Sequence, residues 1–278
     1  MKLRNVWIWV VVAAAPMCGY AQWLNYPAPG TPRTGDGKAD LSAPAPRASN
    51  GKPDLSGVWQ AEAAPFEELA KLLPGGVNGL GEDAPSRYFL NMLADFKPSD
   101  APIRPAAAAL FQKHAQAFGN DSPGTNCLPA GVPLADLLPS PYKLIQTPGT
   151  IVMLYEAETT FRQIYTDGRK QLEDPQPSWM GYSVGKWEGD TLVVDAVGFN
   201  DRGWLDAFGH THSDAMHVTE RFHRRDFGHM EVQITIDDSK TYTRPFTVKF
   251  NQVLLPDTDL IESFCSEDEK DLPHLGLK

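Results

Sequence analysis

The chain has 278 residues, of which 42% are hydrophobic and 22% are charged. Acidic residues outnumber basic ones by 35 to 25, which gives a formal net charge of -10 at pH 7. An acidic chain without a basic stripe is unsuited to nucleic acid, or to an anionic membrane surface, as a partner. Enzymes, small-molecule binding proteins and structural proteins remain as the classes to weigh.

The first 21 residues have the layout of a secretory signal peptide. Lys2 and Arg4 precede an apolar run at 6–15, and mostly small residues then lead to Ala21. This order predicts cleavage near Ala21 and a periplasmic or secreted protein. The apolar run is shorter than the roughly 20 residues that span a bilayer, and no later stretch approaches that length, so no membrane span is expected.

Two cysteines remain after cleavage, Cys127 and Cys265. In an oxidising compartment an even pair is most simply one disulfide, and we predict that bond. The alternative is two independent buried thiols. The disulfide would close a long loop and, in the chain-entropy model, would contribute about 5 kcal/mol to the free energy of unfolding.

Residues 22–56 contain a tandem repeat, with TPRTGDGKADLS at 31–42 and APRASNGKPDLS at 45–56. Two copies are too few for a solenoid, and their proline, glycine, serine and charged residues do not bury a core. The stretch is therefore expected to be a disordered or loosely docked leader. It precedes a single globular domain at 57–278.

The expected parts of that domain are a helical or irregular cap at 57–140, an antiparallel β-barrel at 141–266 and a tail at 267–278. The cap opens with Gly57-Val58-Trp59. This Gly-x-Trp is similar to the opening of lipocalin-type barrels, where the tryptophan closes one end. The match is short, and it indicates an architecture but no function.

A few helices are predicted in the cap, at 65–73, 84–93 and 104–118. In the third, Pro105 suits a first helical turn and Gly119-Asn120 supplies a stop. His114 on this helix is expected in ordinary surface or edge packing.

Short strands separated by turn residues follow from Tyr142 onwards. Nine strands joined by short connections predict a mainly β fold, an antiparallel meander that forms a lipocalin-like barrel or a strongly curved sheet. The predicted strands are 142–147, 150–157, 160–166, 180–187, 191–199, 215–224, 229–237, 244–254 and 260–265.

The register of one hairpin can be predicted. Apolar residues alternate along 215–224 and 229–237, and a three-residue loop at 226–228 keeps both apolar sets on one face. Gly228 is expected in the left-handed position of that loop. This register places His223 opposite Glu231 and His217 opposite Asp237, as polar pairs on the outer face.

The same register places Glu220 in the inward row, opposite Ile234. A carboxylate there must be paired, hydrated or protonated, because an isolated buried charge is very costly. It is therefore either a functional group or part of a structural ion pair with an inward arginine such as Arg162 or Arg244.

Two kinds of catalysis could use the loop that precedes this strand. His210 and His212 are two residues apart, so in an extended segment they could present two imidazoles to a transition metal, with Asp214 as a further ligand. In the metal-free alternative, Glu220 and His212 work as acid and base, with Asp201 beside them. Histidines solvated at a rim are the simpler interpretation.

Ligand binding without catalysis is the third possibility. Trp179, Trp187 and Trp204 supply aromatic surface, and Arg162 could anchor a polar group. Aromatic residues in sheets are also ordinary core. No G-x-S-x-G elbow or dinucleotide fingerprint is present.

Several motifs resemble those of an acidobacterial-type family of exported bacterial proteins. They are GKPDLSGVW (51–59), CLPAGVP (127–133), QTPG (146–149), YTDGR (165–169), GYSVGKWEGDTLVVD (181–195), GHTHSD (209–214), ERF (220–222) and DFGHMEVQITIDD (226–238). The resemblance spans most of the mature chain and assigns no activity to particular residues.

The leading hypothesis is an exported protein that binds a small apolar or aromatic molecule in a pocket containing Glu220. One alternative is an enzyme, either an isomerase, hydratase or lyase or a metal-assisted hydrolase, that uses Glu220 with His210 and His212. The other is a structural envelope protein.

Overall fold

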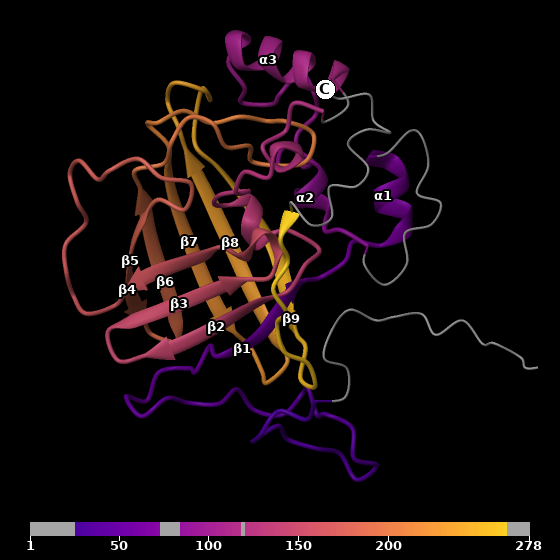
Figure 1. The fold of residues 1–278 in the computed structure, drawn as a ribbon, viewed down its shortest axis with the longest axis vertical. Helices are drawn as coiled ribbons and strands as arrows, with labels where there is room; N and C mark the ends of the chain where they lie inside the picture. The colour runs from indigo at the N-terminus through magenta and orange to yellow at the C-terminus, as the bar shows by residue number, and fades with distance from the viewer. Residues whose placement is uncertain (1–25, 73–83, 118–119, 266–278) are drawn as a thin grey trace, which may run out of the picture.

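The computed structural model describes residues 26–72, 84–117 and 120–265, and both the predicted signal peptide and the tail at 267–278 lie outside them. Within these residues nine strands form a closed barrel, which confirms the mainly β prediction (Figure 1). The strands are β1 (Gly57–Ala61), β2 (Tyr142–Thr147), β3 (Thr150–Tyr155), β4 (Phe161–Tyr165), β5 (Tyr182–Glu188), β6 (Thr191–Val197), β7 (His217–Arg224), β8 (His229–Asp237) and β9 (Phe246–Leu254). The helical segments are α1 (Phe66–Leu72), α2 (Arg87–Leu90), α3 (Pro105–Gln116), η1 (Gly124–Asn126), η2 (Leu134–Asp136) and η3 (Ala157–Thr159).

The barrel is not a pure antiparallel meander, so that prediction is wrong at one pair. Strands β4 and β5 run parallel and share only two register pairs, Ile164 with Ser183 and Tyr165 with Val184. The cause is the long connection between them at 166–181. Parallel neighbours need a crossover of about a dozen residues or more, which returns the chain to the end of the sheet where it started.

One of the nine strands also differs from the predicted set. Residues 260–265 form no strand; β1 pairs with both β2 and β9 instead. The disulfide between Cys127 and Cys265, with Cα atoms 5.5 Å apart, confirms the predicted bond and ties this segment to the cap.

The β7–β8 hairpin has the predicted register. His217 lies opposite Asp237, His223 opposite Glu231 and Glu220 opposite Ile234. The expected left-handed conformation at Gly228 is wrong, since its φ is not positive. Glycine is needed there for another reason: a Cβ atom would overlap Leu41 of the leader.

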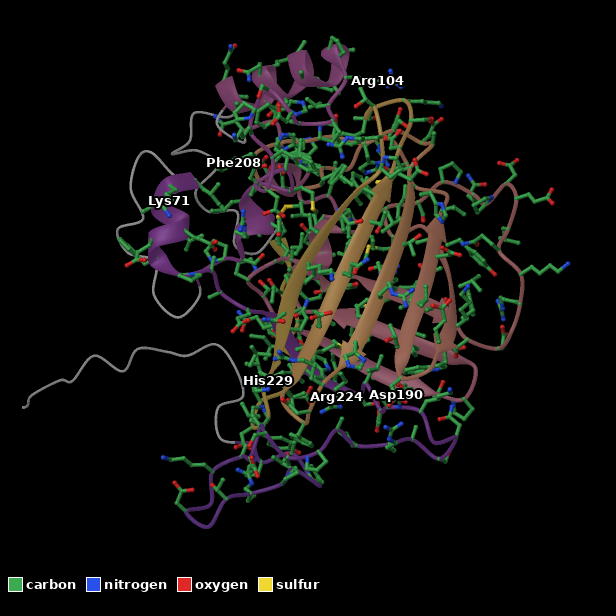
Figure 2. The ribbon with its side chains drawn as sticks, turned by 180° about the vertical axis from the view of Figure 1, so that it is seen from behind. Lys71, Arg104, Asp190, Phe208, Arg224 and His229 are labelled. Carbon is green, nitrogen blue, oxygen red and sulfur yellow. A yellow bond between two sulfur atoms is a disulfide. The ribbon has the colours of Figure 1, made fainter. Side chains whose placement is uncertain are left out.

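The leader at 26–56 is docked, so of the two alternatives expected for it, disorder is wrong. Each repeat forms a turn closed by an isolated bridge, and the arginine of each turn reaches the barrel domain. The Arg33 Nη1 group donates to Asp257 at 2.9 Å, and that of Arg47 donates to Asp190 at 2.8 Å. The two copies of the repeat therefore form similar turns at one end of the barrel, each held by an arginine–aspartate pair (Figures 1 and 2).

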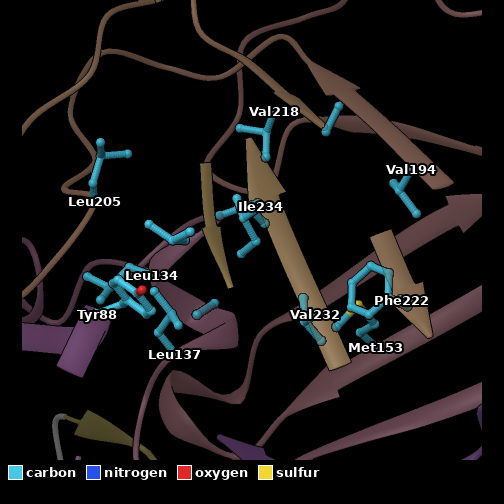
Figure 3. Packing of buried hydrophobic residues seen from close by; sticks show 14 of the residues in the cluster. Tyr88, Leu134, Leu137, Met153, Val194, Leu205, Val218, Phe222, Val232 and Ile234 are labelled. Atoms are coloured by element: carbon cyan, nitrogen blue, oxygen red, sulfur yellow. The ribbon is translucent and has the colours of Figure 1, made fainter. Parts of the chain in front are cut away.

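That end is closed by Trp59, which is fully buried. The guanidinium of Arg224 lies over its ring at 4.9 Å and donates to the carbonyl of Asp54 in the leader. Inward side chains of the strands fill the space beyond it with an apolar core, part of which, including Val218, Phe222 and Ile234, is shown in Figure 3.

Helix α3 covers the opposite end (Figure 1). His114 stacks on Trp204 at 4.6 Å, and Phe111 stacks on His210 at 4.0 Å. His114 is buried, so the expectation of surface or edge packing is wrong, because the 204–210 loop packs against that face of the helix. Among the helices of the described ranges, none is long and apolar enough to cross a membrane.

Candidate functional site

A buried ion pair crosses the interior of the barrel. Arg162 on β4 and Glu220 on β7 occupy inward positions and are 2% and 0% exposed. The Nη1 group of Arg162 donates to Oε1 of Glu220 at 2.9 Å, and its Nη2 group donates to Oε2. Of the two arginines weighed as partners, Arg162 is the one that pairs with Glu220.

A second buried carboxylate joins the pair. Oδ2 of Asp136, at the end of η2, lies 3.5 Å from Nη1 of Arg162. The hydroxyl of Tyr155 donates to Oδ1 of Asp136 at 2.6 Å, and Nε of Arg162 donates to the Ser183 hydroxyl at 3.0 Å. Two buried carboxyl groups thus share one guanidinium. The sequence hypothesis missed Asp136, although an acid inside the apolar run VPLADLLP is a detectable signal.

Burial favours the protonated form of the second carboxyl group, Asp136. Burial, and then the nearby Glu220 carboxylate, raise the pKa of Asp136 well above its ordinary value. Burial likewise raises the pKa of Tyr142 and Tyr155, so both remain neutral hydroxyls. The neutral form of Asp136 is therefore favoured, because it avoids the desolvation cost of a second buried negative charge beside the ion pair.

We expect Asp136→Asn to change how stability depends on pH. Because the pKa of Asp136 is higher in the folded than in the unfolded state, the native protein loses stability as pH rises above the ordinary aspartate value. The variant lacks this loss. As pH rises, the free energy of unfolding of the variant minus that of the native protein should therefore increase by up to about 1.4 kcal/mol per pH unit. Urea denaturation of both proteins from pH 4 to pH 8 measures this, and parallel curves would contradict it.

A groove opens on the barrel wall where β4 and β5 diverge. It encloses about 440 Å³ and is formed by β4 and by the segment 178–182 that leads into β5. We call it the β4–β5 groove. The side chains used below are Phe161, Arg162 and Gln163 from β4 and Trp179, Met180 and Tyr182 from the other segment.

The four residues predicted to bind a ligand are only partly brought together. Arg162 and Trp179 line the β4–β5 groove. Trp204 instead stacks under α3 and lines a separate cavity of about 200 Å³, and Trp187 packs against the core. Glu220 does not line the groove. It is linked to the groove by its hydrogen bond with Arg162.

The 200–214 loop does not assemble the predicted metal site. Nδ1 of His210 lies 2.6 Å from Oδ2 of Asp206, whereas Nδ1 of His212 donates to the Ser213 carbonyl at 3.1 Å. Asp214 pairs with Lys240 at 2.6 Å. Within the described ranges, no group of three or more histidine, cysteine, aspartate or glutamate residues is arranged to hold a metal ion.

Asp206 is the organising residue of this loop. Its carboxylate is fully buried and accepts the backbone N–H groups of Met92 at 2.7 Å, Gly209 at 3.0 Å and His210 at 3.2 Å. Asp206 was not among the predicted site residues. The Asp-x-x-x-His spacing around a glycine was the signal for a turn that an aspartate holds together.

The predicted catalytic set of Glu220, His212 and Asp201 is brought together only in part, because the charge of Asp201 acts on His212 whereas Glu220 pairs with Arg162. Asp201 is exposed, and burial lowers the pKa of His212, which favours its neutral ring. The polar partners of Glu220 are Arg162 and Asp136 instead. The geometry therefore offers a stable buried charge network and a separate aromatic groove beside it.

No protein-family model matches the sequence, and no curated protein matches it. The resemblance to exported acidobacterial-type proteins therefore rests on the sequence motifs alone.

Proposed function

We propose that the protein is an exported binding protein that holds a small, uncharged aromatic or apolar molecule in the β4–β5 groove. The observation that carries the proposal is the concentration of Phe161, Trp179, Met180 and Tyr182 around one cavity of about 440 Å³. This volume lies in the range of about 300–1,000 Å³ that is typical of ligand sites, and such sites are mostly apolar with a few polar groups.

The charge of the groove supports an uncharged ligand. Arg162 is its one charged lining residue, and Glu220 already neutralises it. The proposed role of Glu220 is therefore to hold Arg162 in place behind the groove. An acid–base role for Glu220 itself would require a substrate to reach a side chain that is 0% exposed.

Two further features support an exported, lipocalin-like binding protein. The Cys127–Cys265 disulfide suits an oxidising compartment. The buried Trp59 lies under Arg224, an arrangement that suits the Gly-x-Trp similarity to lipocalin-type barrels. The 200–214 loop also contacts the groove, because the Arg202 guanidinium lies over the Trp179 ring at 4.8 Å.

Phe161→Ala is expected to weaken binding of pyrene, an uncharged aromatic probe, by about tenfold, which is about 1.4 kcal/mol. Phe161 is 62% exposed and can cover a ligand without being needed for the core. Phe66 on α1 is a matched control, being 61% exposed and outside the groove. Pyrene fluorescence titration of both variants measures this. Equal losses, or no binding to the native protein, would exclude the groove and favour a structural role.

A further inference from the structure

The backbone of β4 shows what kind of ligand the groove takes. Residues of an antiparallel strand alternate between bonding to one neighbour and to the other. The Tyr155 N–H donates to the Thr160 carbonyl at 2.9 Å, and the Thr166 N–H donates to the Gly149 carbonyl at 2.8 Å. The even-numbered residues of β4 therefore bond to β3. Phe161 and Gln163 direct their N–H and C=O groups to the other side, toward β5.

Strand β5 uses only part of this edge. The two pairs, Ile164 with Ser183 and Tyr165 with Val184, engage the carbonyl of Gln163 and both groups of Tyr165. No residue of the described chain bonds to the remaining three groups, which are the N–H and C=O of Phe161 and the N–H of Gln163. Both residues line the β4–β5 groove. A stretch of unpaired sheet edge thus faces a cavity.

We propose that the groove binds a short extended peptide bearing an aromatic or apolar side chain, which continues the parallel ladder from β5 along β4. This inference rests on the proposed function and names its ligand class. In a parallel ladder, one peptide residue level with Arg162 donates its N–H to the Phe161 carbonyl and accepts from the Gln163 N–H through its own carbonyl. Those are two of the three unpaired groups.

The side-chain surroundings match the same occupant. Adding a strand to a sheet edge gains affinity from main-chain hydrogen bonds, and adjacent pockets take the side chains. Here the edge lies beside Trp179, Met180 and Tyr182, which can pack on the peptide's apolar side chain. Continuity with the β4–β5 ladder sets the direction of the peptide, because its N–H and C=O must follow the parallel pattern.

The test compares N-acetylphenylalanine methylamide with two N-methylated forms of it. Methylating the phenylalanine nitrogen removes the N–H that would bond to Phe161 and leaves that carbonyl unpaired, so Kd should rise about tenfold or more. Methylating the terminal amide nitrogen is the matched control. In an extended residue this nitrogen points away from β4, so Kd should stay within about twofold.

Intrinsic tryptophan fluorescence gives the three dissociation constants, and pyrene binding is measured in parallel. If both methylated forms bind equally well, the ladder is absent and the inference is overturned, while Phe161-dependent pyrene binding still supports the proposed function. If neither pyrene nor the amide binds, both fail together. A selective loss on methylating the phenylalanine nitrogen supports the peptide ligand.

Discussion

Replacing Arg162 with methionine is expected to lower the free energy of unfolding by about 3–5 kcal/mol, as is typical when one partner of a buried ion pair is removed. Glu220 would then remain in the barrel without the guanidinium that donates to both of its oxygens. Asp136 would lose the same positive charge. Methionine fills much of the volume, so the loss reflects charge more than a cavity. Urea denaturation at pH 7 gives the difference.

A matched control lies beside Glu220 on the same strand. Arg221 pairs with Glu188 at 3.1 Å, with both side chains well exposed. Arg221→Met should therefore cost less than about 1 kcal/mol. Adding Glu220→Gln to Arg162→Met should recover part of the stability, because it removes the uncompensated charge. If Arg162→Met is as mild as Arg221→Met, the buried pair does not stabilise the barrel.

Regular alternation made the hairpin at β7 and β8 predictable from the sequence. Apolar residues occupy every second position there, and a shift of one residue would turn all of them outward. The inward position of Glu220 followed directly from that register. Its pairing with Arg162 could only be proposed as one of two options, because it depends on how β4 and β7 face each other across the barrel.

Features set by long connections or by contacts between distant segments could not be predicted. The parallel β4–β5 pair depends on the path of residues 166–181, which has no strand pattern. The leader docks through ion pairs whose partners lie more than a hundred residues away, as for Arg47 and Asp190. The proline, glycine and serine content of the leader predicted a disordered or loosely docked stretch, and local composition carries no information about the surface that receives it.

The candidate site likewise depends on contacts that the sequence pattern could not predict. Two histidines spaced for one face, His210 and His212, suggested a metal site, but the spacing argument assumes an extended strand. The loop is instead folded around Asp206, and the two rings have different partners. The β4–β5 groove arises where the sheet is incomplete. It is therefore a property of topology that no motif in β4 or β5 encodes.

Removing the disulfide by changing both Cys127 and Cys265 to alanine is expected to cost up to about 5 kcal/mol of stability. The bond joins residues separated by 138 positions, and in the chain-entropy model a loop of that size restricts the unfolded chain strongly. The native strands do not depend on it directly, because β9 ends before residue 265 and is held by β1 and β8. The variant should therefore fold to the same barrel and unfold at lower urea.

The slope of the urea transition separates an effect on the unfolded state from one on the native state. Without the cross-link the unfolded chain exposes more surface, so the m-value should increase as the midpoint falls. Dithiothreitol should shift the native protein in the same direction and leave the variant unchanged, which controls for the alanine substitutions. A lower midpoint with an unchanged m-value would place the effect in the native contacts of residues 260–265, such as that between Ser263 and Thr159 beside the groove.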